Sequence, residues 1–175
     1  NKDLNIKAKS QFPKDQIFDF VIIATPTNYD PESNYFDTSS VDSSIQNLQK
    51  INSKATIVIR STLPVGYTKK IQKENKSNEI IFVPEFLREG VALQDSLYPS
   101  RIIIGSHSEK AKIFSNLLLD GAEDKSFKIL FTKSTEAESS KLFANAFLAL
   151  RVSFFNELDS FSLSKDLDTK EIINA

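Results

Sequence analysis

The stretch IIFVPEFLREGVALQDSLYPSRIIIGS, residues 80–106, decides the fold class, because it places two short apolar runs on either side of a polar segment. Each run is too short for a helix and fits a strand that is buried on both faces. The polar segment opens with Glu85, Arg88 and Glu89, so charged side chains follow directly where the first strand should end.

Three further apolar runs of this kind lie elsewhere in the chain, at Phe18–Ala24, Ala55–Arg60 and Lys128–Thr132. Helical patterns separate most of the five runs. The first is a helix capped by Asp37 or Thr38, with Val41, Ile45, Leu48 and Ile51 on one face. The second is a polar helix from about Tyr67 to Asn75. The third begins at a capping box formed by Ser106 and Glu109. Because parallel strands need crossover connections, the order predicts an α/β fold with a parallel sheet.

The end of the chain differs in composition from the rest. All six Pro and all four Gly lie at or before Gly121, whereas the segment from about Thr135 to Asp166 contains neither. With Thr135 and Glu138 as a capping pair, this segment predicts a helix of roughly 30 residues and about 45 Å. One small sheet cannot cover such a helix, so its surplus apolar side chains need another domain or a second copy of the chain. These are Phe147, Leu150, Phe154, Phe155, Leu158 and Phe161.

The overall composition argues against several classes of function. The 22 Lys and Arg against 23 Asp and Glu give a net charge of -1, which offers no reason to expect nucleic acid or a membrane as partner. Without Cys, and with a single His, the chain should hold no metal site, and the default compartment is the reducing cytoplasm. The longest apolar run, Leu142–Phe155, is shorter than the roughly 18 to 20 residues of a membrane span. Because no Met is present, even at position 1, we expect an internal piece of a longer protein.

Ligands of open parallel sheets bind beyond the carboxyl ends of the strands. Three polar turns follow strands there, ATPTNYD, RSTLPVG and PEFLREG, so Thr25, Thr62, Glu85 and Glu89 should lie along one rim. A helical turn over residues 85–90 would place both carboxylates on one face with Arg88 beside them. Each threonine taken alone fits a helix cap equally well.

The long helix carries a polar stripe of Glu138, Lys141 and Asn145, at positions i, i+3 and i+7. An amide that is buried without a partner costs about 1 to 3 kcal/mol, so Asn145 faces either a ligand or a structural partner. Arg101 likewise fits a phosphate contact or an ion pair. The sequence contains no GxGxxG motif, no P-loop and no cluster of metal-ligating residues.

Four segments together resemble the UDP-glucose/GDP-mannose dehydrogenase family, in particular its UDP-glucose 6-dehydrogenases of the short bacterial type. They are DFVIIATPTNYDPESNYFDTSSV (19–41), STLPVGYT (61–68), PEFLREGVALQDSLYPSRIIIG (84–105) and STEAESSKLFANAFLALRVSFFNELDSF (134–161). The resemblance implies the latter part of a Rossmann-like NAD-binding domain over residues 1–133 and a central dimerisation helix over residues 134–175. A glycine-rich half upstream, and a downstream UDP-binding domain with the catalytic cysteine, would lie outside these residues. The 175 residues are therefore not expected to turn over substrate by themselves.

The resemblance also implies NAD-dependent oxidation of UDP-glucose to UDP-glucuronate, through two hydride transfers and a thioester. It assigns cofactor contacts to Thr25, Thr62 and Glu89, and catalytic roles to Thr62, Glu85, Lys141 and Asn145. It assigns substrate contacts to Glu85, Phe86, Leu87, Arg88, Glu89, Lys141 and Asn145. In this assignment Glu85 assists the attack of water, while Lys141 and Asn145 stabilise oxyanions. The alternatives are a GDP-mannose or UDP-N-acetylmannosamine dehydrogenase, or a non-catalytic module that dimerises through the long helix.

Overall fold

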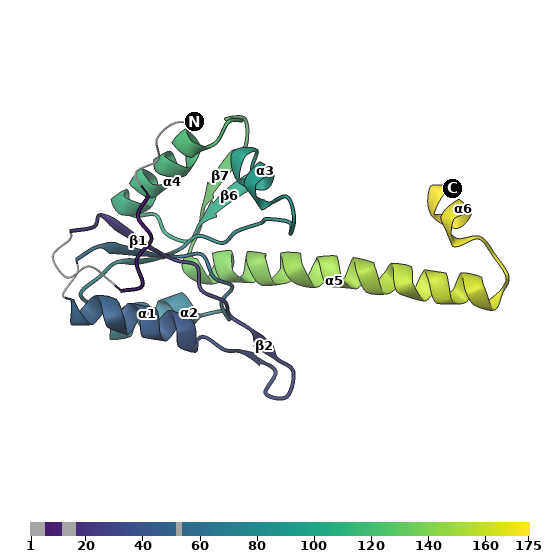
Figure 1. Ribbon diagram of the computed structural model, residues 1–175, viewed down its shortest axis with the longest axis horizontal. Coiled ribbons are helices and arrows are strands. Elements are labelled where there is room, and N and C mark those ends of the chain that lie inside the picture. The colour runs from purple at the N-terminus through teal and green to yellow at the C-terminus, as the bar shows by residue number, and fades with distance from the viewer. Residues whose placement is uncertain (1–5, 12–16, 52–53) are drawn as a thin grey trace.

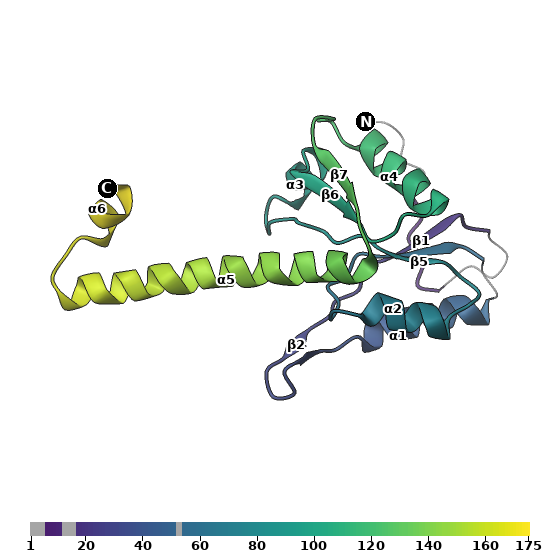
Figure 2. The same ribbon diagram turned by 180° about the vertical axis from the view of Figure 1, so that it is seen from behind.

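The computed structural model describes residues 6–11, 17–51 and 54–175. In chain order the elements are β1 (Phe20–Ile23), β2 (Tyr29–Asp30), β3 (Tyr35–Phe36), α1 (Ser39–Lys50), β4 (Thr56–Ile59), α2 (Tyr67–Glu74), β5 (Ile80–Phe82), α3 (Ala92–Leu97), β6 (Arg101–Ile104), α4 (Glu109–Gly121), β7 (Lys128–Phe131), α5 (Ser134–Ser164) and α6 (Thr169–Asn174). Helix α5 projects from an α/β body and carries α6 at its far end (Figure 1; Figure 2 shows the same from behind). The five predicted strands and the long helix are confirmed.

The strands β1, β4 and β5 form one parallel sheet in that order, and their carboxyl ends are in register. Ile23 lies opposite Ile59, which lies opposite Phe82. Strands β6 and β7 form a second parallel sheet, which the Gly105 N–H joins to the first by donating to the Phe82 carbonyl at 2.8 Å. The single sheet that the sequence suggested is therefore divided, because residues 84–100 with α3 intervene and β6 takes β7 as its ladder partner.

Strands β4 and β5 are buried on both faces, whereas Ile22 of the edge strand β1 is exposed. Alternate strand residues face opposite layers, as the period of a β-strand requires. Ile57 and Ile59 of β4 join a buried cluster with Val41, Ile45 and Leu48 of α1. Their neighbour Val58 instead belongs to a second cluster, which includes Ala111 and Phe114 of α4. Figure 1 shows α1 and α2 on one side of the sheet and α4 on the other.

The first turn of α5 packs directly against the ends of the strands. A Cβ atom added to Gly105 would lie 2.9 Å from the Phe82 carbonyl oxygen, 3.1 Å from Ser134 Cα and 3.2 Å from Ala137 Cβ. Only a glycine allows α5 to begin this close to β6, because those contacts are shorter than van der Waals distance.

Beyond its first turns α5 extends away from the sheet, and most of its surplus apolar side chains are exposed. They are Phe147, Leu150, Phe154, Phe155 and Phe161, while Leu158 is partly buried. In the part of the chain that the structure describes, no helix combines the length and apolar character that a membrane crossing requires.

Two capping predictions are wrong. Helix α4 is capped by Ser108, whose Oγ accepts from the Ala111 N–H at 3.1 Å, and not by Ser106, which accepts from the Ser108 N–H. Helix α5 begins after Lys133 without a side-chain cap, and the Glu138 carboxylate bonds outside its own helix. At α1 the N-cap is Thr38, and the adjacent Asp37 carboxylate accepts from the Ser39 N–H at 2.9 Å.

The turn-rich segment after β1 holds a short antiparallel hairpin, β2 and β3, which the sequence did not predict. The Tyr29 and Phe36 rings pack edge to face across it, with centroids 5.3 Å apart. Each of these strands has two residues, which is too few to show an alternating pattern, and the residues at 30–34 between them are typical of turns.

Candidate functional site

The three polar turns meet at the carboxyl edge of the first sheet, where the base of α5 reaches them. A pocket of about 390 Å³ lies there, lined by Thr25, Thr62 and Glu85 from the turns and by Lys141 from α5. The structure thus brings four of the predicted site residues into one pocket from four separate segments of the chain.

Hydroxyl groups fix the turn after β1 against its neighbours. Ser40 Oγ, in the first turn of α1, donates to Thr25 Oγ1 at 2.9 Å. The buried Ser61 donates its hydroxyl to the Thr25 carbonyl at 2.6 Å, which ties the turn after β4 to the turn after β1. Thr62, the next residue, lines the pocket and is partly buried.

An ion pair between Arg60 and Glu85 holds the carboxylate of the third turn. Arg60 Nε donates to Glu85 Oε1 at 2.5 Å, and the Arg60 backbone N–H donates to the Ile23 carbonyl at 2.8 Å. The Arg60 side chain is 17% exposed, whereas that of Glu85 is 37% exposed and accessible to water. Sequence reasoning missed Arg60 as a site residue, although its place one residue beyond β4, beside the turn after β5, was a usable signal.

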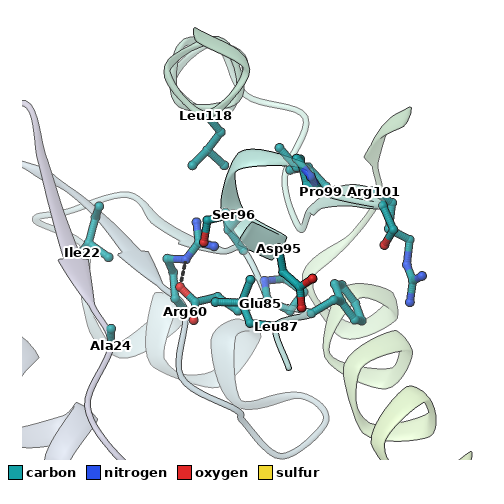
Figure 3. A pocket seen from close by; sticks show the side chains of 15 residues that line it. Ile22, Ala24, Arg60, Glu85, Leu87, Asp95, Ser96, Pro99, Arg101 and Leu118 are labelled. Carbon is teal, nitrogen blue, oxygen red and sulfur yellow. Dashed lines mark hydrogen bonds and ion pairs between the residues drawn. The ribbon is translucent and has the colours of Figure 1, made fainter. Parts of the chain in front are cut away.

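A second pocket, of about 340 Å³, lies on the α4 side of this ion pair. Figure 3 shows Arg60 and Glu85 between Ile22 and Ala24 of the β1 segment and Asp95 of α3, with Leu118 of α4 above them. Arg60, Glu85, Ala24 and Leu87 line both the first and the second pocket, so the ion pair contributes to both.

A third pocket, of about 570 Å³, collects most of the residues predicted to contact a substrate. Its lining includes Phe86, Leu87, Arg88, Tyr98, Arg101, Lys141 and Asn145. Two cations approach the Phe86 ring, with the Arg101 guanidinium 4.2 Å and the Lys141 ammonium 5.4 Å from its centroid. Such contacts are favourable because the face of an aromatic ring is electronegative. Arg101, for which the sequence left a phosphate contact or an ion pair open, makes a cation–π contact with Phe86.

Lys141 lines both the first and the third pocket, as does Leu87. Burial of Lys141 lowers the pKa of its ammonium group; the nearby Glu85 carboxylate opposes that shift and Arg101 adds to it. Asn145, one turn further along α5, is exposed, so the amide bears no cost of unpaired burial and is accessible from the third pocket.

The predicted trio of Glu85, Arg88 and Glu89 does not form. Residues 85–88 are not helical, and Arg88 turns to Asp95, with Nη2 to Oδ1 at 2.7 Å and Nε to Oδ2 at 3.0 Å. These bonds, together with the Arg88 backbone N–H, lower the pKa of Asp95 to about 2. Glu89 is exposed in a turn with Gly90 and lines none of the three pockets.

The predicted polar stripe on α5 lies on one face of the helix but not in one environment, because Glu138 is fully buried, Lys141 is partly buried and Asn145 is exposed. The Glu138 carboxylate accepts from the backbone N–H groups of Gly66 at 2.6 Å and Thr68 at 2.7 Å. No local sequence rule predicts a bond between residues so far apart. In the described ranges, no group of three or more His, Asp or Glu is arranged to hold a metal ion.

Family models match most of the chain. Residues 2–120 match the NAD binding domain of the UDP-glucose/GDP-mannose dehydrogenase family, and residues 135–175 match the central domain of the same family. Among curated proteins, the UDP-glucose 6-dehydrogenase of Campylobacter jejuni is 50% identical over 89% of this chain and 39% of its own length. The UDP-glucose 6-dehydrogenase of Streptococcus pneumoniae is 45% identical over 99% of this chain and 46% of its own length.

Solved structures agree with this similarity. A UDP-glucose dehydrogenase from Pyrobaculum islandicum is 29% identical, with a TM-score of 0.64 over 86% of this chain and 40% of its own. The UDP-N-acetyl-mannosamine dehydrogenase of Staphylococcus aureus has a TM-score of 0.77 over 96% of this chain and 42% of its own, and at 20% identity it shows the fold alone. The chain spans less than half the length of the relatives named here.

Proposed function

The chain belongs to the UDP-glucose/GDP-mannose dehydrogenase family, and we propose that the full-length protein oxidises the C6 hydroxyl of UDP-glucose to a carboxylate with NAD. The observation that carries the proposal is the pocket shared by Thr25, Thr62, Glu85 and Lys141. It offers hydroxyls for a cofactor, a carboxylate for proton transfer and a cation for developing negative charge. The identity of 45 to 50% to two proteins named UDP-glucose 6-dehydrogenase supports the choice of substrate.

The residues at the rim of β1 and β4 fit a dinucleotide. The hydroxyls of Thr25, Thr27 and Thr62, with the Asn28 amide, line the pocket beyond the strand ends, where nucleotides bind to parallel sheets. We assign cofactor contacts to Thr25 and Thr62, and a place at the outer edge of the cofactor site to the exposed Glu89. When bound, NAD accepts a hydride from the substrate carbon, and two such transfers account for the four electrons of the overall oxidation.

The third pocket fits the sugar nucleotide. Phe86, Leu87 and Arg88 line it from the segment after β5, and Lys141 and Asn145 line it from α5. We propose that the Lys141 ammonium and the Asn145 amide donate to substrate oxygens that gain negative charge, since fixed donors stabilise such charge most effectively in a partly dry site.

Glu85 is proposed to take a proton from the water that hydrolyses a covalent thioester, formed on a cysteine outside these residues. The ion pair with Arg60 holds Oε1, while Oε2 can receive the proton. Its side chain is open enough for water to approach. A carboxylate held in place beside its water is the usual arrangement for a general base.

The proposal is tested with full-length protein, NAD and three substrates: UDP-glucose, GDP-mannose and UDP-N-acetylmannosamine. We expect two NADH per UDP-glucose consumed, with UDP-glucuronate as product. If GDP-mannose or UDP-N-acetylmannosamine is turned over faster, that sugar nucleotide and not UDP-glucose is the substrate. If none of the three substrates yields NADH, the dehydrogenase assignment is rejected. Residues 1–133 are assigned to the cofactor domain and residues 134–175 to the central segment in this proposal.

We further propose a homodimer through α5, because its apolar side chains remain uncovered. Phe147 is 60%, Leu150 65%, Phe154 64% and Phe161 54% exposed. Each such side chain gains roughly 1.5 to 3 kcal/mol when it is buried, so a few of them outweigh a modest cost of association. A two-fold crossing of two α5 helices is the simplest closed arrangement that buries them.

Phe154→Glu should therefore convert the full-length protein from dimer to monomer or aggregate in sedimentation velocity at micromolar concentration. Asn156→Glu is the matched control, because it adds the same charge to an exposed position on the opposite side of the helix. A Phe154→Glu protein that remains dimeric would show that this face of α5 is not the interface.

A further inference from the structure

The carboxylate of Glu138 is buried, ionisable and used by no step of the proposed reaction. Its exposed fraction is 0%, and its two oxygens accept separately, Oε2 from the Gly66 N–H at 2.6 Å and Oε1 from the Thr68 N–H at 2.7 Å. We refer to these two hydrogen bonds as the Glu138 clamp. A charged acceptor at such short distances makes strong hydrogen bonds.

The clamp replaces a cap that α2 lacks. Gly66 is the N-cap residue of α2, has a left-handed φ of 93° and has no side chain with which to satisfy the first N–H groups of the helix. A side chain from α5 supplies the acceptor instead, and its negative charge lies at the positive end of the α2 dipole. Two helices far apart in sequence are therefore joined by one buried group.

The clamp lies between two residues of the proposed site. On one side, the turn that leads into Gly66 carries Thr62, and on the other side Lys141 follows Glu138 by one turn of α5. Thr62 and Lys141 line the same pocket. A shift of α5 along or about its axis would change the distance between them.

The other contacts at the base of α5 are mainly packing contacts, and Ala137 belongs to the buried cluster that includes residues of α1 and β4. Gly105 packs against Ser134 and Ala137, which fixes how closely the first turn approaches β6. Those contacts are apolar or involve backbone atoms alone, so they tolerate rotation better than two directional hydrogen bonds do. Most of the rest of α5 is exposed, so its orientation depends on this base.

We propose that Glu138 is a positioning residue of the dehydrogenase reaction, which sets the place of the Lys141 ammonium relative to Thr62 by clamping α5 to the start of α2. This inference rests on the proposed function. It assigns Glu138 no contact with substrate or cofactor.

The test uses Glu138→Gln in the full-length protein. The glutamine side chain keeps the volume but turns an NH2 group toward one of the two backbone N–H donors, so one bond of the clamp must break. We expect kcat with UDP-glucose and NAD to fall about 10- to 100-fold in protein that is folded at the assay temperature, since a displacement of about 1 Å can cost about 100-fold. KM should change much less than kcat.

Glu136→Gln is the matched control, because it removes the same charge from an exposed carboxylate on the same turn of α5. Its kcat should stay within about twofold of wild type, because Glu136 takes no part in the clamp. Glu138→Asp, which keeps the charge but shortens the reach by one methylene, should give an intermediate kcat and serves as the second variant where Glu138→Gln does not fold.

A second readout needs no substrate. The Lys141 pKa, measured by NMR titration of its labelled Cε, should rise in Glu138→Gln as water reaches the loosened ammonium. Loss of the negative charge of Glu138 alone would lower the Lys141 pKa, as would loss of the Glu136 charge in the control. A raised Lys141 pKa therefore indicates displacement of Lys141, and a lowered one indicates only the loss of a nearby charge. Glu85 and Arg101, which also act on Lys141, are unchanged in both variants.

Wild-type kcat and an unraised Lys141 pKa in folded Glu138→Gln would overturn the positioning role. So would a failure of both Glu138 variants to fold, because the carboxylate would then be a structural group. A wild-type protein without turnover would reject the proposed function, while the Lys141 titration would still decide whether the clamp positions Lys141.

Discussion

Replacing Lys141 with alanine in the full-length protein is expected to lower kcat by about 10² to 10³, the typical cost of removing one donor to a developing oxyanion. KM for UDP-glucose should change far less. An interaction that strengthens only in the transition state lowers kcat and kcat/KM together when it is lost. Steady-state kinetics with UDP-glucose and NAD measure both parameters.

The position of Lys141 is the physical reason for this expectation. It is partly buried where the first and third pockets meet, so its charge acts in a site from which water is partly excluded. Burial lowers the pKa of its ammonium group, whereas the Glu85 carboxylate opposes that shift. A charge in such a place interacts with a developing oxyanion more strongly than one in bulk water.

Lys133→Ala provides the matched control. Lys133 is the exposed residue directly before α5 and makes no side-chain cap, so its loss removes the same charge without touching the pockets. Its kcat should equal that of wild type. A Lys141→Ala enzyme that keeps kcat within about threefold of wild type would remove Lys141 from the mechanism, since a lost oxyanion donor costs far more.

The sequence predicts the elements of this fold well, because their signals are local. Short apolar runs mark every strand of the two parallel sheets, and a segment without Pro or Gly marks α5. Since parallel strands end at one edge, the meeting of Thr25, Thr62 and Glu85 also followed from the sequence. Lys141 lines the same pocket because α5 begins beside β6. The order of the elements along the chain does not by itself require α5 to begin there.

The errors concern partners chosen by three-dimensional packing. Arg88 was expected beside Glu85 but bonds to Asp95, and Glu85 bonds to Arg60. Glu138 matches a capping-box pattern, yet it caps a different helix. A local pattern states that a side chain needs a partner, whereas the tertiary structure decides which partner lies within reach.

Replacing Glu85 with glutamine is expected to slow the hydrolytic half of the reaction by about 10² to 10⁴, the usual contribution of a general base. The amide oxygen of the new side chain can still accept from Arg60, so the geometry of the turn is retained, but the amide cannot take a proton from water. The first hydride transfer should stay within a few-fold of wild type. Rapid-quench experiments with labelled UDP-glucose should show a covalent enzyme-bound intermediate that builds up.

Arg60→Gln separates the role of the base from that of the ion pair. This variant keeps the Glu85 carboxylate but removes the cation that holds Oε1 at 2.5 Å. If Glu85 acts as a base, Arg60→Gln should slow hydrolysis much less than Glu85→Gln does, because the proton acceptor remains. Equal defects in the two variants, or an aldehyde that accumulates in Glu85→Gln in place of the covalent species, would show that Glu85 serves only to hold the turn in place.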